Sequence, residues 1–538
     1  MHTTYRFERN SKFTLLVSVV LLYTLFSSRA LGQDTNSTNT QITSSPSDQS
    51  VAGGGPQQAV QPPQHSSAES VQDRGFFSRL GHAYLDDWKA NSSDLPAAPN
   101  PPRRGTPGPL NSPPFPAADW PIGGTVVIGA PDYQTYPVMQ AINENRSRIK
   151  VYGWVDVGFN VSTSNKGKYA NAPAAYDVIP NSIQLDQAAL YIERLPNTVQ
   201  KEHFDWGFRL ANIYGLDYRY TTAFGVFSQQ LLQKNNTYGD DPVMYYADFY
   251  VPQVAKGMDI RVGRYISLPD IEAQLAPNNY TYSHSLTYTY DCYTQHGVNT
   301  TTKLSDHWTV QLGISAGCEA APWSKYAKAT GDVCASYTWS NGGDNLYFCA
   351  NSLNSAKYSY NNLSAYYLTY YHKFNSTWHT DTEYWYQYER NVPNLCFGLS
   401  PCISYGPKAN IGANAGTITS PSLITGANGA QCNPNATHCY APDYAIVNYI
   451  EHEWNRHHTS LTIRNEFFDD LKGQRTGTAT KYSEHLVGFN FWLGSTVTFR
   501  PEVRLEHSYD KPAYDAPTGG APTKSTQLTV AGDLIWHF

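Results

Sequence analysis

The sequence predicts an all-β fold, a transmembrane antiparallel up-and-down β-barrel of about 14 strands (12–16) behind a disordered, Pro-rich N-terminal extension. Three observations predict this fold. Apolar and polar residues alternate with a period of two from residue 149 to the end, which is typical of strands whose faces meet different surroundings. The connections between these strands are alternately short and long, as in bacterial outer-membrane barrels. The chain ends on an amphipathic strand whose last residue is Phe538.

The composition excludes other classes of protein. Lys and Arg number 38 against 44 Asp and Glu, so the net charge is -6 and no basic excess indicates a nucleic-acid partner. Charged residues make up 15% of the chain, below the roughly 25% of an ordinary soluble domain, whereas aromatic residues reach 14%. After residue 26 no stretch approaches the roughly 18 apolar residues that a membrane helix needs, which excludes a helical membrane protein.

The N-terminal residues are predicted to direct export. Residues 1–32 have the form of a cleaved signal peptide, with a basic start, an apolar stretch at 13–26 and small residues at 30–32. An uncleaved membrane anchor is the alternative. Residues 33–74 are rich in Ser, Thr, Gln, Asn, Gly and Pro, which predicts a disordered tether in the periplasm.

Residues 75–148 combine two features. Phe76, Leu80, Tyr84 and Trp88 recur at helical spacing, which predicts a short amphipathic helix that docks on the body of the protein. A partial plug is the alternative. The prolines that follow predict an extended Pro-rich linker.

The predicted barrel covers residues 149–538. Its first strand shows the pattern, because Val151, Val155 and Val157 alternate with polar residues such as Asp156 and Asn160. The predicted strands are 149–161, 180–194, 201–214, 243–252, 257–267, 292–300, 306–317, 357–374, 376–390, 441–455, 458–470, 480–494, 496–509 and 523–538.

The lengths of the connections orient the barrel. Connections after even-numbered strands are short, such as the single residue Asn375, whereas most of the others are long, such as 268–291, 318–356 and 391–440. Outer-membrane barrels have short periplasmic turns and long external loops. The sequence therefore predicts the outer membrane of a Gram-negative bacterium, with Sec-dependent export and a periplasmic N-terminus. A soluble jelly roll or propeller is the alternative.

The cysteines are predicted to form disulfides at the outer rim. No two of the eight form a CxxC pair, which suits an oxidising compartment better than a zinc site. The spacing favours Cys396 with Cys402 and Cys432 with Cys439, while the other pairings stay open. The candidates, all assigned to the outer ends of strands or to outer loops, are Cys292, Cys318, Cys334, Cys349, Cys396, Cys402, Cys432 and Cys439.

The last strand has a further implication. It looks like the C-terminal strand of clients of the bacterial barrel-assembly machinery, which typically ends in an aromatic residue. Phe538 is therefore the candidate assembly signal, and the expected partners are this machinery and outer-membrane lipid.

Several stretches carry a resemblance to a known family. They are Gln184–Arg194, Asp259–Tyr265, Glu272 followed by Tyr282–Ser285, and Arg464–Asp470 leading into Gly473–Gly477. Over about residues 145–538 the chain resembles the β-barrel porins of the OmpL-like family. The resemblance implies a porin that lets small hydrophilic solutes or ions diffuse passively. It departs from the family pattern after the fifth strand, where Asp270-Ile271-Glu272 stands in place of an expected Gly-Tyr-Glu.

The inner face of the predicted barrel is charged. Acidic residues outnumber basic ones there, which predicts a mild cation preference in a water-filled lumen. Compensated pairs that merely fill the interior are the alternative. By analogy with general porins, the connection 268–291 is expected to fold inward as a constriction. The candidate pore-lining and constriction residues are Asp259, Arg261, Asp270, Glu272, Asp381, Glu383, Arg464, Glu466, Arg500, Glu502, Arg504 and Glu506.

No catalytic constellation, metal site or cofactor site emerges. Glu451 and Glu453 flank His452, but neighbours on a strand face opposite sides, so these three residues cannot share a site. The sequence therefore predicts no enzyme. Two other functions stay open, a non-conducting surface barrel whose disulfide-stapled loops bind a partner, and an outer-membrane hydrolase. Porins of this size are often trimers, so a homotrimer is an assembly that the sequence allows.

Overall fold

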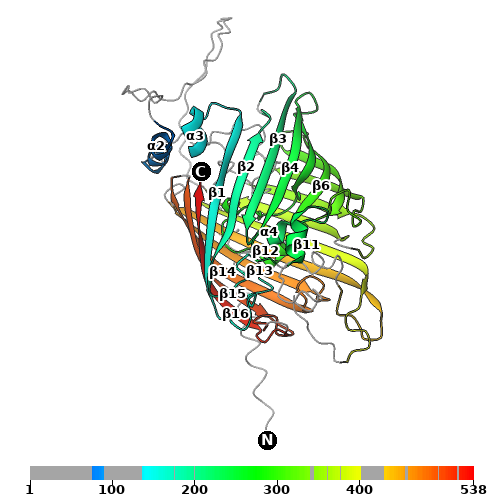
Figure 1. The fold of residues 1–538 in the computed structure, drawn as a ribbon. Coiled ribbons are helices and arrows are strands. Elements are labelled where there is room, and N and C mark those ends of the chain that lie inside the picture. The colour runs from blue at the N-terminus through cyan, green and yellow to red at the C-terminus, as the bar shows by residue number, and fades with distance from the viewer. Residues whose placement is uncertain are drawn as a thin grey trace, which may run out of the picture. The chain divides into compact units, whose positions relative to one another are not determined.

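The computed structural model shows a closed antiparallel barrel of 16 strands, in which β1 pairs with β16 (Figure 1). This confirms the predicted fold class, with the strand number at the upper end of the expected range. The structure describes residues 75–89, 136–174, 176–198, 200–234, 236–339, 344–359, 362–375, 377–400, 429–454, 459–494, 496–517 and 520–538.

Each strand pairs with its neighbours along the chain, as expected of an up-and-down barrel. The strands are β1 (Ile149–Ser162), β2 (Ser182–Arg194), β3 (Asp205–Gly215), β4 (Gly239–Val251), β5 (Met258–Ile266), β6 (Thr294–Lys303), β7 (Trp308–Cys318), β8 (Thr330–Thr338), β9 (Asp344–Leu353), β10 (Ser364–Lys373), β11 (Trp378–Pro393), β12 (His438–Trp454), β13 (Thr459–Asp470), β14 (Thr480–Leu493), β15 (Val497–Ser508) and β16 (Thr526–His537).

The described helices are short. They are α2 (Phe76–Lys89), α3 (Pro137–Asn143), α4 (Tyr218–Thr221), α5 (Ser228–Gln233) and α6 (Leu286–Thr289), with a 3-10 turn at Ala276–Asn278. None of the described helices is long and apolar enough to cross a membrane. The predicted signal peptide and tether, and the Pro-rich part of the linker, lie outside the described residues.

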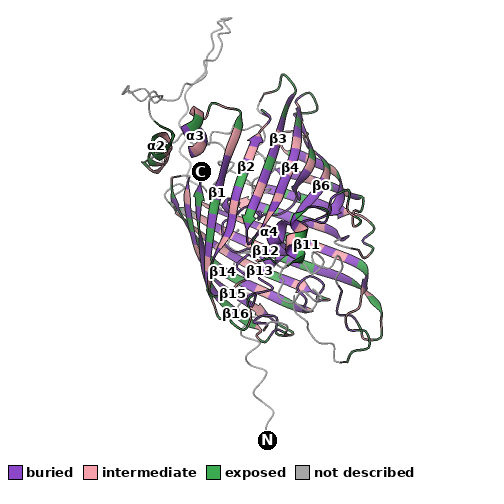
Figure 2. Cartoon of the chain, in the orientation of Figure 1, coloured by how far each residue is buried: buried purple, intermediate pink, exposed green. Residues whose placement is uncertain are grey.

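The two faces of the strands differ as the period-two pattern predicts. Along β14 the side chains of Val487, Phe489 and Phe491 are exposed, whereas those of Glu484 and Asn490, which point to the other face of the strand, are buried. The same alternation of exposed and buried residues runs along the other strands of the wall (Figure 2). An apolar outer face and a polar inner face are the arrangement that a barrel needs in lipid.

A charged side chain on the outer face should therefore destabilise the barrel, by an amount that depends on how deep in the bilayer the side chain lies. Val487→Arg, in the middle of β14, is expected to lower the free energy of unfolding by about 2–4 kcal/mol, because lipid does not solvate the guanidinium. Leu493→Arg, at the end of the same strand, should cost at most about 1 kcal/mol. Urea titration of the barrel in lipid vesicles measures both, and equal effects would contradict the assignment of the outer face.

The prediction of one long loop at 318–356 is wrong, because β8 and β9 lie within it. The outward residues of β8 include Gly331, which has no side chain, and Ala335, whose side chain is small. Both weaken the contrast between apolar and polar positions on which a strand prediction depends. The connection after β8 is short, so the alternation of short and long connections still holds.

Two of the cysteines lie in these two unpredicted strands. Cys334 and Cys349 face each other across β8 and β9, with their side chains buried, and form a disulfide within the wall. Their predicted place in an outer loop is therefore wrong.

The other disulfides lie at the rim. Cys292 is joined to Cys318 at the end of β7, and the predicted pair Cys432–Cys439 is confirmed. The predicted pairing of Cys396 with Cys402 involves a residue outside the described ones.

The helix α2 lies against the ends of the last strands. Tyr84 donates a hydrogen bond to the carbonyl of His537 (2.8 Å), and the Trp88 indole donates one to Thr496 (2.8 Å). No residue of α2 is buried, so these contacts place it at the edge of the wall and not inside it. The terminal residue Phe538 donates its backbone N–H to Gly153 of β1 (2.9 Å), which helps to close the barrel.

Candidate functional site

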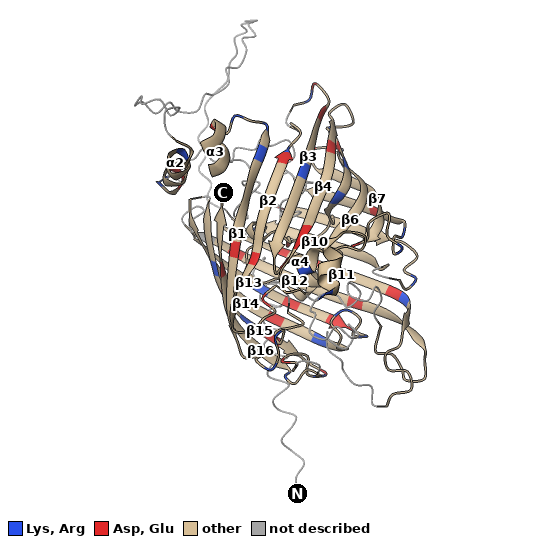
Figure 3. Cartoon of the chain, in the orientation of Figure 1, with Lys and Arg blue, Asp and Glu red and all other residues tan. Residues whose placement is uncertain are grey.

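The connection between β5 and β6, residues 267–293, folds into the barrel, as predicted for 268–291. We call it the inserted segment. All its described side chains are buried, and its hydrogen-bond partners lie on β2, β11, β13 and β15. The barrel interior therefore contains a second layer of polypeptide. Figure 3 shows that positions of both charge signs are distributed along the strands of the wall.

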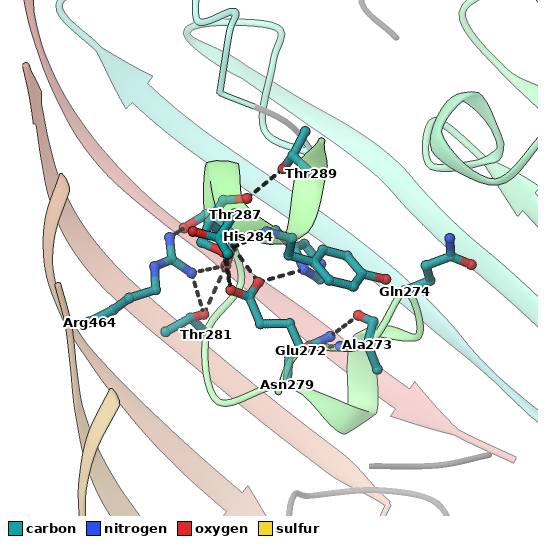
Figure 4. A network of polar contacts seen from close by, with 12 residues as sticks. Glu272, Ala273, Gln274, Asn279, Thr281, His284, Thr287, Thr289 and Arg464 are labelled. Atoms are coloured by element: carbon teal, nitrogen blue, oxygen red, sulfur yellow. Dashed lines mark hydrogen bonds and ion pairs between the residues drawn. The ribbon is translucent and has the colours of Figure 1, made fainter. Parts of the chain in front are cut away.

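Arg464 of β13 is the central anchor of this segment (Figure 4). Its Nε donates to Glu484 on β14 (2.6 Å), and its two terminal nitrogens donate to the backbone carbonyl (2.6 Å) and the hydroxyl (2.9 Å) of Ser283. Further bonds reach Thr281 (3.0 Å) and Tyr449 (3.1 Å). A buried guanidinium is stable only with such a set of acceptors, so this contact joins the segment to the wall.

Glu466, two residues further on the same inner face of β13, holds the start of α6. Its carboxylate accepts the backbone N–H of Leu286 (2.9 Å) and both the N–H and the hydroxyl of Thr287. The first N–H groups of a helical turn have no partner within the turn, and a carboxylate satisfies them well.

Two charges on β15 hold the first half of the segment. Arg500 pairs with Asp533 (Nε to Oδ1, 2.9 Å) and donates to the carbonyls of Ala276 (2.6 Å) and Asn279 (2.9 Å). Glu502 accepts the N–H groups of Tyr282 (3.1 Å) and Ser283 (3.2 Å). The wall thus binds mainly the backbone of the segment.

Glu272 forms its contacts with other residues of the inserted segment. Its carboxylate accepts the N–H and the hydroxyl of Ser285, and it lies 3.1 Å from Nδ1 of His284. Burial raises the pKa of Glu272, but the His284 hydrogen bond and Arg464 outweigh burial and hold it below its usual value. Burial lowers the pKa of His284, so a neutral imidazole donates to an ionised carboxylate.

Arg504 and Glu506 of β15 lie together in a different place. Arg504 pairs with Asp177 of the β1–β2 connection (2.7 Å) and with Glu506 (3.2 Å). Glu506 also accepts the amide of Gln527 (2.8 Å). These residues join the β1–β2 connection to the wall.

Asp259 and Arg261 of β5 face the interior on another side. Arg261 donates to Asp248 of β4 (3.0 Å), and its guanidinium lies 3.8 Å from the centre of the Tyr246 ring. Asp259 is buried in the same group. The structure therefore separates this pair from Arg464 and Arg500.

Asp381 and Glu383 are adjacent on the inner face of β11. Asp381 lies 3.6 Å from the imidazole of His379, which is in contact with the hydroxyl of Tyr280 in the inserted segment (3.1 Å). Glu383 accepts the hydroxyl of Thr369 on β10 (3.1 Å).

The inner face contains both compensated ion pairs and acidic residues outside such pairs, so each interpretation of the inner charges describes part of it. Arg464, Arg500 and Arg504 are compensated by acidic partners, as in a filled interior. Other acidic residues of the interior, such as Asp381 and Glu383, have no arginine partner among the described ion pairs, so acidic groups outnumber their basic partners there. No group of three or more His, Cys, Asp or Glu in the described part of the chain could hold a metal ion.

Sequence reasoning did not single out several residues that complete this site. They are Asp177, which pairs with Arg504, His284 and Ser285, which bind Glu272, and Asp291 near the end of the segment. Only His284 and Ser285 carried a signal, because they belong to one of the stretches that resemble the OmpL-like porins. Asp177 and Asp291 stand in connections, where no periodicity marks an inward side chain.

Comparisons with solved structures found outer-membrane proteins of low sequence identity. A porin described as anion-selective, from Comamonas acidovorans, is 8% identical, and the similarity covers 72% of this chain and 99% of that one, with a TM-score of 0.44. The outer membrane channel DcaP of Acinetobacter baumannii is 9% identical, with coverage of 72% and 97% and a TM-score of 0.41. OmpT of Vibrio cholerae in its trimer form is 9% identical, with coverage of 72% and 99% and a TM-score of 0.42.

No curated protein sequence matches the chain. The sequence profile of the family described as "Putative beta-barrel porin-2, OmpL-like" matches residues 148–538. The match spans the whole barrel from β1 to the C-terminal residue. The chain therefore belongs to the OmpL-like β-barrel porin family.

Proposed function

We propose that this member of a porin family lets small hydrophilic solutes and ions diffuse passively across the outer membrane, with a preference for cations. The proposal rests on one observation. The chain forms a closed barrel with an apolar outer face, and charged side chains in its interior hold the backbone of the inserted segment. Sixteen strands enclose a space wide enough for an aqueous channel. The inserted segment narrows that space.

The same geometry determines which solutes are expected to pass, by their size and by the sign of their charge. The inward side chains and the inserted segment are largely buried, so a path between them would be narrow and bordered by polar groups. Acidic groups such as Asp259, Asp381 and Glu383 face the interior, and a pathway lined by acidic groups favours cations.

Liposome swelling tests the proposal. Vesicles with the refolded barrel should swell in solutions of small neutral sugars, and the rate should fall steeply as the mass of the sugar rises. Vesicles without protein control for leakage. Absence of swelling with every solute, from protein whose heat-modifiable migration shows that it folded, would contradict the proposal.

A second function is favoured by one observation. The described inward side chains are so largely buried that the barrel could serve as a non-conducting scaffold whose disulfide-stapled loops bind a partner. The swelling assay separates the two functions, because a scaffold would leave the vesicles impermeable.

Membership of this family indicates a channel protein of the bacterial outer membrane. Export through the signal peptide, a periplasmic N-terminus and assembly through Phe538 belong to the proposal, and the backbone bond from Phe538 to Gly153 supports a role of the last residue in closure. Outer-membrane lipid as a partner and a homotrimer remain predictions.

A further inference from the structure

The helix α2, which lies beside α3 and the end of the barrel (Figure 1), has an apolar side and a polar side. Phe77, Tyr84 and Trp88 share one side, because about 3.6 residues make a helical turn and these residues are about two and about three turns apart. We call this side the aromatic stripe. The residues of the opposite, polar side are Arg79, His82, Asp86 and Lys89.

The aromatic stripe meets the outer face of the wall at one residue. The ring centre of Trp536, on β16, lies 5.6 Å from that of Tyr84 and 6.0 Å from that of Trp88, and the Trp536 indole donates a hydrogen bond to the Tyr84 hydroxyl (3.0 Å). Trp536 is 43% exposed and stands on the same outer face as Leu534. The aromatic stripe therefore continues the apolar outer surface of the barrel, which faces lipid.

Polar contacts hold α2 in this orientation. Asp87 accepts a hydrogen bond from the hydroxyl of Thr496 (2.8 Å) in the β14–β15 turn. Gly494 of the same turn leaves room for this contact, because a Cβ there would collide with the Asp87 carboxylate. From the polar side, Nε of Arg79 donates to the carbonyl of Ala141 in α3 (2.6 Å). The helix is thus fixed to the wall and to α3.

Large apolar side chains of α2 nevertheless remain uncovered. Phe77 is 84% exposed, so neither the wall nor α3 covers most of its side chain. Its ring packs edge-on against that of Phe76 (5.4 Å between centres), which is also exposed, as is Leu85. Exposure of such groups to water is unfavourable. Because the aromatic stripe begins at the lipid-facing Trp536, the neighbouring medium that can cover them is lipid.

We propose that α2 lies in the lipid leaflet at this end of the barrel, with Phe77 among the acyl chains and Asp86 toward water. Amphipathic helices with Phe, Trp and Leu on one side bury that side about 5–10 Å into the boundary between headgroups and acyl chains. The short β14–β15 turn marks this end, so in the predicted orientation the leaflet is the periplasmic one. This goes beyond the proposed function, because it requires a barrel in a bilayer but no conduction.

Fluorescence quenching tests the position of both sides of α2. Phe77→Cys and Asp86→Cys each carry an environment-sensitive dye in the full-length protein, refolded into phosphatidylcholine nanodiscs that leave both ends of the barrel open to water. Brominated phosphatidylcholine quenches a dye in the leaflet, and iodide quenches a dye in water. Brominated lipid should quench the dye at position 77 several-fold more strongly than the dye at position 86, and iodide should show the reverse order.

Two controls accompany this measurement. Wild-type protein treated with the same dye corrects for reaction at native cysteines, and heat-modifiable migration shows that each variant has folded. Equal quenching of both positions by brominated lipid overturns the proposal. A dye at position 77 that neither reagent quenches also overturns it, because protein, from a second copy or from another part of this chain, then covers the aromatic stripe.

A measurement without a dye uses trypsin, which cleaves after Arg79. Lipid around α2 should protect this bond in nanodiscs, and replacing Phe76 and Phe77 together by Ser should speed its cleavage several-fold, measured from the mass of the fragment that begins at Leu80. Ser78→Ala, at an exposed position of the same turn, is the matched control and should leave the rate unchanged. Equal rates in the double variant and the wild type overturn the proposal.

Discussion

Replacing residues 269–291 by Asn-Gly is expected to raise the single-channel conductance several-fold. The ends suit this change, because Ile266 pairs with Thr294 and the N–H of Ser267 donates to the carbonyl of Tyr293 (2.9 Å). A two-residue turn can therefore join β5 to β6 as an ordinary hairpin. The space that the inserted segment occupied would fill with water, which solvates the wall charges that had held it.

The barrel should still assemble after this deletion. Arg464 keeps Glu484 and Arg500 keeps Asp533, whereas Glu466 and Glu502 lose the N–H groups of the segment and would be solvated by the water that replaces it. Replacing Pro322–Ala327 of the β7–β8 connection, where no residue is buried, by Gly-Ser is the matched control and should leave the conductance near the wild-type value. Unchanged conductance in the 269–291 variant would show that the inserted segment does not restrict the path.

Arg464→Ala is expected to lower the free energy of unfolding by about 3–5 kcal/mol, because it leaves Glu484 as a buried charge without its close partner. It also removes the bonds to Ser283 and Thr281, so the inserted segment should loosen and the current should become noisier. Urea titration followed by tryptophan fluorescence measures the first effect, and single-channel recording measures the second.

A paired variant separates the charge from the packing. Arg464→Met combined with Glu484→Leu removes both charges and should recover much of the lost stability, because apolar residues of similar volume can replace a buried ion pair. It should not restore the contacts to Ser283, so the noise should remain. A single Arg464→Ala variant as stable as the wild type would contradict the role of Arg464 as an anchor.

The barrel was predictable because a strand in lipid needs one apolar and one polar face. This demand is clear in β14, where Val487 alternates with Glu484 and Asn490, and weak in β8, where Gly331 and Ala335 face outward. The helix α3 has only seven residues, too few for a helical period to show against the prolines before it.

The site was predictable only in part. Parity on the strands assigns Arg464 and Glu502 to the interior, but their partners in the inserted segment lie 181 and 219 residues away in sequence. No local pattern specifies the path of a connection across a barrel. The acceptors of Arg464 therefore follow from the fold alone.

Single-channel recording from the refolded barrel in a planar bilayer under a salt gradient tests the claim that the barrel conducts ions. A barrel narrowed by the inserted segment should give stable current steps of small size, with a reversal potential directed toward the cation. Silence, from protein whose β content and heat-modifiable migration show that it folded, would contradict the claim and favour a non-conducting barrel.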